Sequence, residues 1–125
     1  MPDPVADQLA GLNLSVLIGT LNRSPELRAL PSGDHLLALD LTVHPAGEPR
    51  ESVPVAWPGA PASAAAWRVG EELLVVGRVR RRFFRAGGIT QSRTEVVATT
   101  AIPVRRSATV RKAVRAAIAG VERRL

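Results

Sequence analysis

Arginine recurs at every second position of one predicted strand and is followed by phenylalanine, a pattern suited to binding an anionic polymer. Residues 71–84 read EELLVVGRVRRRFF, and successive side chains of a strand point to opposite faces. One face is apolar, and the other carries, after two aliphatic residues, Arg78, Arg80, Arg82 and Phe84. Arginines bind phosphates and a flat ring stacks on a base for about 1–3 kcal/mol, so this face is typical of a surface for single-stranded nucleic acid. The same cationic run also protects an exposed sheet edge, which leaves a purely structural interpretation open.

The charge of the chain is divided unequally between its two parts. Residues 1–77 hold four Lys or Arg and nine Asp or Glu, whereas residues 78–125 hold thirteen and two, within a net charge of +6. Such asymmetry favours a nucleic acid or, less often, an anionic membrane surface as partner. A basic face that is only solvated is the alternative that charge alone leaves open.

The length and composition indicate one domain. A chain of 125 residues is long enough to bury a core of its own. The absence of cysteine excludes a disulfide framework and cysteine-ligated zinc. The start, MPDPVADQLAG, has neither a basic n-region nor an apolar h-region, and no apolar run approaches the roughly 20 residues that span a bilayer. We therefore expect a cytoplasmic, nucleoid-associated protein that binds no membrane.

Short strands account for most of the chain. Apolar residues alternate with others in NLSVLIGTL and HLLALDLTVH, and ESVPVAW follows as a third strand that Pro54 assigns to an edge. The alanine run in PGAPASAAAW predicts one or two helical turns. Residues 71–84 and TQSRTEVVATTAI form two further strands joined by a glycine-rich hairpin, with a bulge or sharp bend at Gly77. The pattern predicts an all-β fold, a small antiparallel barrel of five strands with a short helix between the third and the fourth.

Residues 105–125 have the spacing of a basic amphipathic C-terminal helix. Ser107 has the side chain of an N-cap, and apolar residues recur after it at helical spacing. Arg111, Lys112 and Arg115 lie mainly off the apolar stripe. The stripe favours packing on the barrel or on another subunit, while contact with nucleic acid or with an acidic partner stays open.

Three segments, in order, resemble the family of bacterial single-stranded DNA-binding proteins. NLSVLIGTLNRSPELRALPSG, residues 13–33, resembles the first strand of that family, its Pro-Glu-(Leu/Val)-Arg corner and its Pro-x-Gly turn. VGRVRRRFF, residues 76–84, resembles the Gly-x-(Leu/Val)-Arg-x-Arg strand, and TEVVA, residues 94–98, resembles the last barrel strand. The resemblance implies an OB-fold over residues 12–104, after an N-terminal extension over residues 1–11. It also implies a homo-oligomer, tetramer or dimer, that binds single-stranded DNA largely without sequence preference in replication, repair or recombination.

The predicted DNA-binding residues combine the strand pattern with this resemblance. They are Arg28, Trp57, Arg78, Arg80, Arg82 and Phe84. Arg78 joins the set through strand alternation, and the other five match family positions along the DNA path. Trp57 also has the parity of Val53 and Val55, so a place in the core is its alternative.

Two departures from the family predict a divergent or accessory member. PAGEPRES lacks the aromatic residues that the family carries at and after the second-strand hairpin, so phosphate contacts weigh more than stacking. The helix ending VERRL stands where the family has a disordered tail with an acidic tip that recruits other proteins. The alternative functions are an OB-fold interaction or assembly module with weak or no DNA binding, and an RNA-binding OB-fold.

No arrangement of residues predicts catalysis. His35 and His44 lack the spacing of metal ligands. Glu71 and Glu72 are adjacent in a predicted strand and therefore point to opposite faces, where they cannot act on one substrate. We expect a protein that is not an enzyme and that uses neither a metal nor a cofactor.

Overall fold

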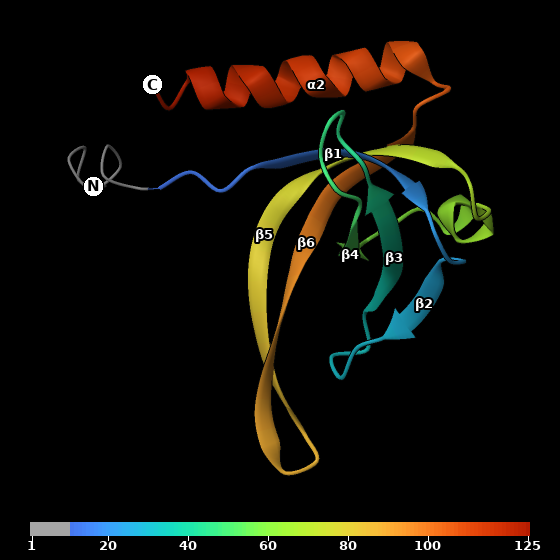
Figure 1. Ribbon diagram of the computed structural model, residues 1–125, viewed down its shortest axis with the longest axis vertical. Coiled ribbons are helices and arrows are strands. Elements are labelled where there is room, and N and C mark those ends of the chain that lie inside the picture. The colour runs from blue at the N-terminus through green and yellow to red at the C-terminus, as the bar shows by residue number, and fades with distance from the viewer. Residues whose placement is uncertain (1–10) are drawn as a thin grey trace.

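The computed structural model describes residues 11–125, so the expected N-terminal extension lies outside the described residues except for Gly11. The elements of this part follow one another in the order β1 (Ser15–Leu21), β2 (Glu26–Ala29), β3 (His35–Val43), β4 (Glu51–Pro58), the 3-10 helix η1 (Ala62–Ala66), β5 (Glu72–Ala86), β6 (Ile89–Pro103) and the α-helix α2 (Ser107–Glu122) (Figure 1). This mostly-sheet architecture is consistent with an OB-like fold. No helix within residues 11–125 is long and apolar enough to cross a membrane.

The corner between β1 and β3 contains a strand that the sequence did not predict, so the sheet has six strands rather than five. β2 pairs with β3 from Glu26 opposite Ala38 to Ala29 opposite His35. All four side chains of β2 are exposed. Because it buries no face, this strand lacks the alternation of apolar and polar residues by which strands are predicted.

The sheet has the strand order β1-β5-β6-β4-β3-β2, and β1 also pairs with β3 at Thr20 and Leu21. β4 therefore lies between two strands, and the prediction that Pro54 marks an edge strand is wrong. The pairing of β4 with β6 is parallel, unlike the antiparallel pairing predicted for the whole sheet, and it is restricted to Val55 and Ala56, so Pro54 lies just outside it. A missing N–H is tolerated where one side of a strand is unpaired.

The apolar faces of the predicted strands supply the core. The buried cluster includes Leu21, Leu37, Leu39, Leu41, Val55, Trp57, Leu73, Val75, Val96 and Ala98. Burial of each such aliphatic side chain stabilises the fold by about 1.5–3 kcal/mol. The alternation within β3 and β5 therefore predicted the correct faces, and the alanine run forms the short helix η1 beside this cluster.

A bulge in the β5–β6 hairpin decides which side chains face each other. The pairing shifts by one residue between Val76 and Gly77. Thr99 is the extra residue of β6, and its hydroxyl donates to the carbonyl oxygen of Val76 at 2.9 Å. A Cβ atom at Gly77 would overlap the carbonyl oxygen of Val97, so only glycine fits there. The predicted irregularity at Gly77 is confirmed.

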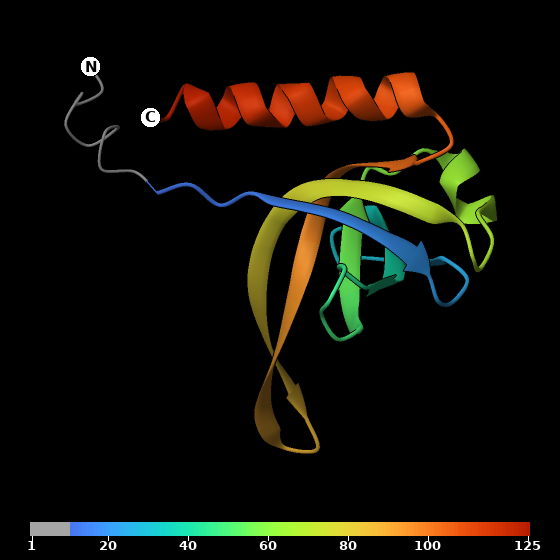
Figure 2. The same cartoon turned by 45° about the horizontal axis from the view of Figure 1, so that its top comes forward.

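Helix α2 lies over the outer face of β1, β5 and β6 (Figures 1 and 2). Leu74 and Val76 of β5 and Ile102 of β6 are buried although they lie outside the core cluster. They alternate with the core residues of their strands and therefore point toward the face that carries the helix. The predicted N-cap is wrong: Ser107 is the first helical residue, and Arg106 holds the cap position without a side-chain cap hydrogen bond.

Candidate nucleic-acid interface

A groove with a cavity volume of about 270 Å³ crosses the outer face of the sheet beside the β5–β6 hairpin. Ala38 of β3 and Pro54 and Ala56 of β4 line it. These three residues alternate with core residues of the same strands, so they point away from the core. Their small side chains form the floor of the groove.

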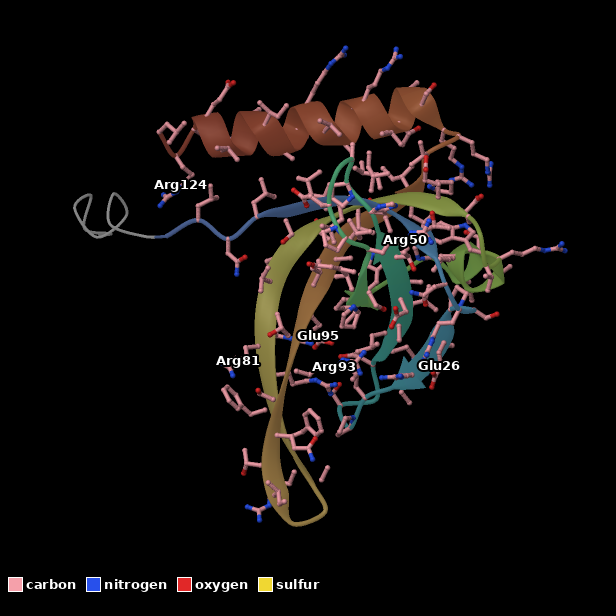
Figure 3. The ribbon with its side chains drawn as sticks, viewed as in Figure 1. Glu26, Arg50, Arg81, Arg93, Glu95 and Arg124 are labelled. Atoms are coloured by element: carbon pink, nitrogen blue, oxygen red, sulfur yellow. The ribbon has the colours of Figure 1, made fainter. Side chains whose placement is uncertain are left out.

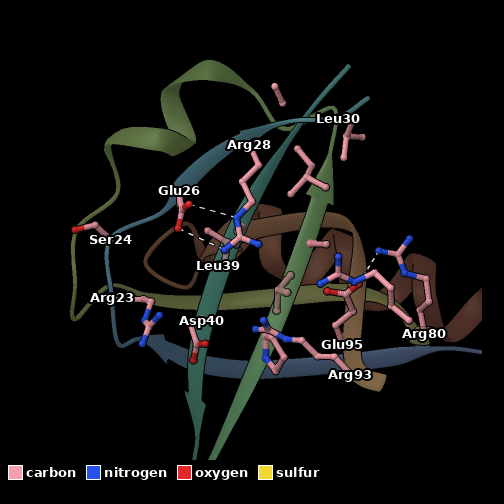
Figure 4. Close-up of a pocket in the computed structure, with 17 residues that line it drawn as sticks. Arg23, Ser24, Glu26, Arg28, Leu30, Leu39, Asp40, Arg80, Arg93 and Glu95 are labelled. Carbon is pink, nitrogen blue, oxygen red and sulfur yellow. Dashed lines mark hydrogen bonds and ion pairs between the residues drawn. The ribbon is translucent and has the colours of Figure 1, made fainter. Parts of the chain in front are cut away.

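Five arginines line the groove: Arg23 and Arg28 on the side of the corner and β2, Arg80 and Arg82 on β5, and Arg93 on β6. Three carboxylates share the lining, namely Glu26, Asp40 and Glu95. Five cations against three anions leave an excess of two positive charges. In Figure 4, Arg28 and Arg93 extend from opposite sides toward the space between them. The groove is therefore suited to an anion.

Glu95 is the buried carboxylate of the groove, with 6% of its surface exposed. Its Oε1 atom lies 2.6 Å from Nη2 of Arg80 and 3.4 Å from Nε of Arg82. Hydrogen bonds between ionised groups are among the strongest in proteins. Glu95 therefore holds both guanidinium groups at the groove and neutralises part of their charge.

Arg80 carries a donor without a partner. Its Nε atom is buried and forms no hydrogen bond with any other described residue. The same guanidinium is held at its Nη2 atom by Glu95, so the group stays fixed at the groove.

Arg82 and Arg93 face each other across the hairpin. Like charges at directly opposed positions of an antiparallel pair destabilise it. Among the five arginines of the groove, Arg23 and Arg93 form no ion pair within the described part of the chain. Arg93 points from β6 toward the side of β3 and β2 (Figures 3 and 4). An anion between Arg82 and Arg93 would offset their repulsion.

Of the other two carboxylates of the groove, Glu26 forms an exposed ion pair and Asp40 accepts hydrogen bonds from uncharged side chains. Glu26 pairs with Arg28 at 3.4 Å, and both side chains are exposed. Such a surface pair contributes about 0–1 kcal/mol, so Arg28 stays available to a second anion. Asp40 accepts hydrogen bonds from Asn22 at 2.8 Å and Ser52 at 2.5 Å. In the part of the chain that the structure describes, no three His, Cys, Asp or Glu side chains gather closely enough to hold a metal ion.

The structure brings three of the six predicted residues together, because Arg28, Arg80 and Arg82 all line the groove. Phe84 continues the face of Arg82 toward the hairpin tip, and its ring centroid lies 5.5 Å from the Arg82 guanidinium carbon. Arg78 is exposed but does not line the groove.

Trp57 lies in the core, which is the alternative that its parity left open. It is 6% exposed, and its ring stacks on that of Trp67 with the centroids 5.8 Å apart. A ring buried in this way presents no open face to a base, and Trp57 does not line the groove.

Sequence reasoning missed five charged residues of the groove: Arg23, Glu26, Asp40, Arg93 and Glu95. Arg23 lies in the corner beside Arg28, and the charge of this segment was its only signal. Arg93 and Glu95 belong to a strand whose register against β5 depends on the bulge at Gly77.

No protein-family model matches this chain, and no curated protein matches it either. The structure is similar to the crystal structure of the wild-type single-stranded DNA binding protein from Thermus aquaticus, with a TM-score of 0.60 and 30% sequence identity. The match covers 74% of this chain and 40% of the Thermus aquaticus chain. The likeness supports the relationship to an OB-fold of this type that the sequence resemblance implied.

Proposed function

We propose that this protein binds single-stranded DNA, largely without sequence preference, on an OB-fold barrel. The proposed site is the groove lined by Arg28, Arg80, Arg82 and Arg93, extended by Phe84 at the hairpin. The observation that carries the proposal is the opposition of Arg82 and Arg93 in a groove lined by five arginines. The likeness to the Thermus aquaticus protein supports it independently.

The chemistry of the groove favours phosphates over bases as the groups that are bound. Arginine is a donor to phosphate oxygens, while the floor residues Ala38, Pro54 and Ala56 offer no side-chain hydrogen bond that distinguishes one base from another. The ring of Phe84 stacks only on a base that is free of its own neighbours, which favours single strands over duplexes. Little sequence preference is the expected result.

Fluorescence anisotropy with labelled oligo-dT tests this function, with a duplex of equal length and an oligo-rU as the other ligands. We expect oligo-dT to bind more tightly than the duplex, and binding to weaken as salt rises. Equal or tighter binding of oligo-rU would favour the RNA-binding alternative. The absence of oligo-dT binding at low salt would refute the proposal.

We further propose a homo-oligomer, in which a second copy pairs with the open edge of β1. β1 pairs with β5 along Ser15–Thr20, but with β3 only at Thr20 and Leu21. Within residues 11–125, the second edge of residues 15–19 therefore pairs with no strand. Val16 and Ile18 on this segment are exposed, so the edge is both apolar and open. Light scattering of the wild type and of Val16→Asp tests this, and a monomeric wild type would contradict it.

A role in replication, repair or recombination belongs to the same proposal, because each of these processes exposes single strands. Deletion of the gene followed by exposure to DNA damage tests this role. We expect increased sensitivity that the wild-type protein restores and Arg93→Ala restores only in part. Equal rescue by both proteins would separate the phenotype from the groove.

The exposed cations of α2 favour a second candidate function, an assembly module for an acidic protein. Arg111, Lys112 and Arg115 are exposed and form no ion pair with another described residue. Poly-glutamate serves as the probe for this alternative. Retention of poly-glutamate that is lost on joint substitution of these three residues by Glu, together with negligible oligo-dT binding, would support it over the DNA-binding proposal.

A further inference from the structure

The β5–β6 hairpin has a second face that the proposed groove does not use. The hairpin projects away from the rest of the sheet (Figures 1 and 2). Its back face consists of Arg81, Phe83 and Arg85 on β5 and their opposite residues Thr94, Ser92 and Thr90 on β6. The three β5 residues lie on the same face of the strand as the core residues Leu73 and Val75, because they alternate in step with them. Beyond the core, however, the face opens to solvent, and Phe83 is 66% exposed.

The back face carries positive charges that no acidic residue within residues 11–125 pairs with. Arg81 and Arg85 form no ion pair within residues 11–125. Their opposite residues are hydroxyl side chains, which donate to anions and carry no charge. Glu95 is the one acidic residue between Leu73 and Pro103, and it belongs to the groove side. The back face is therefore complementary to an anion over its whole length.

The arginines of the back face are held in place rather than free. The guanidinium carbon of Arg81 lies 5.6 Å from the ring centroid of Phe83, and its Nη2 donates to the Ser92 hydroxyl at 3.2 Å. Nη2 of Arg85 donates to the Gly88 carbonyl at 2.9 Å. A cation over a ring is attracted by the electron-rich face of the ring. The groove side repeats this pair, with Arg82 at 5.5 Å from Phe84.

We infer that the back face is a second contact for the same single strand, which passes round the free edge of the hairpin after leaving the groove. This inference rests on the proposed function. Phe83 stacks on a base, and Arg81 and Arg85 bind the phosphates on either side of it. Neighbouring strands lie only about 5 Å apart, so a two-stranded ribbon is narrow enough for one oligonucleotide to reach both of its faces.

A second copy of this chain fits the back face less well. An isologous contact through the same face would bring Arg81 and Arg85 of both copies together without a carboxylate between them. Opposed like charges disfavour association. A polyanion with flat bases satisfies the charge and the ring at once.

Oligonucleotide length separates the two faces experimentally. Oligo-dT of roughly 5 nucleotides fills only the groove, whereas roughly 16 nucleotides, near the upper site size of an OB-fold, reach both faces. We expect Phe83→Ala to weaken binding of the long oligomer roughly five- to 150-fold and to leave the short one unchanged. For the long oligomer, Arg81→Ala is expected to reduce the slope of the logarithm of the binding constant against the logarithm of the salt concentration by roughly 0.7. Ile89→Ala is the matched control, because Ile89 is also 66% exposed on this hairpin but has no ring.

Phe83→Trp supplies a direct spectroscopic test, since both native tryptophans, Trp57 and Trp67, pack against each other at the core. Stacking of a base should quench the added emission with the long oligomer but not with the short one. The back face is not a DNA contact if the wild type binds both oligomers, Phe83→Ala binds them equally well, and neither oligomer changes the emission of Phe83→Trp. If the wild type binds neither oligomer, the proposed function itself fails. A changed subunit number in Phe83→Ala would instead identify the face as an interface between copies and would also overturn the inference.

Discussion

Replacement of Glu95 by Gln probes the electrostatics of the groove most sharply. The carboxylate lies 2.6 Å from Arg80 and 3.4 Å from Arg82, so it pairs with two guanidinium groups that the proposed function assigns to phosphates. Glu95→Gln keeps an oxygen that accepts a hydrogen bond from Arg80 but removes the charge. We therefore expect single-stranded DNA to bind more tightly, because two arginine charges no longer have an internal anion.

The expected magnitude follows from these two contacts. One or two additional phosphates engaged by Arg80 and Arg82 steepen the log–log salt slope by roughly 0.7–1.4 for a single strand. A hydrogen bond to a charged group contributes about 1.5–3 kcal/mol, which corresponds to about tenfold tighter binding or more at low salt. Folding stability should fall, because Arg80, Arg82 and Arg93 then lie together without an anion. The partial exposure of Arg80 and Arg82 limits this loss to about 1–2 kcal/mol.

The assay is anisotropy of labelled oligo-dT at several salt concentrations, with a thermal melt of each variant. Glu71→Gln is the matched control: Glu71 binds Arg105 at 3.0 Å, and neither residue lines the groove. It changes the net charge equally and should leave the salt slope unchanged. A folded Glu95→Gln protein that binds more weakly would contradict this expectation, because Glu95 would then orient Arg80 rather than compete with the phosphate.

Three further predictions concern stability and spectroscopy. Arg93→Ala should stabilise the free protein by about 0.2–1 kcal/mol in a denaturant titration, because it removes the like charge opposite Arg82; a loss of stability would contradict this. Gly77→Ala should destabilise the fold by about 2–4 kcal/mol, since its Cβ atom would overlap the Val97 carbonyl oxygen, and an unchanged melting temperature would refute that contact. Binding of oligo-dT should leave wild-type tryptophan emission nearly unchanged, because Trp57 is 6% exposed; strong quenching would mean that its ring reaches the bases after all.

Alternation and helical spacing predicted most of the fold because they report directly on burial. β3 and β5 show this, since Leu39 and Val75 face the core as their parity requires. β2 was missed for the converse reason, because a strand with four exposed side chains has no apolar face to detect. Pro54 was misassigned since the extent of β4–β6 pairing depends on how the sheet curves, which no local pattern records.

The candidate site was only partly predictable because one bulge reorganises it. If the pairing of Val76 with Thr100 continued without a shift, Glu95 would lie opposite Arg81 and face the back of the hairpin. The shift at Gly77 places it opposite Arg80 instead. Arginines on one strand are visible in a sequence, whereas their partners on the next strand depend on this single residue of register.

The salt dependence of oligo-dT binding by Arg93→Ala is the most direct test of DNA binding in the groove. Arg93 is unpaired within the described part of the groove, so its loss should weaken binding and reduce the log–log slope by roughly 0.7. Arg68→Ala removes an exposed arginine that does not line the groove, and it should leave the slope unchanged. Equal slopes for the wild type and both variants would show that DNA does not bind in this groove.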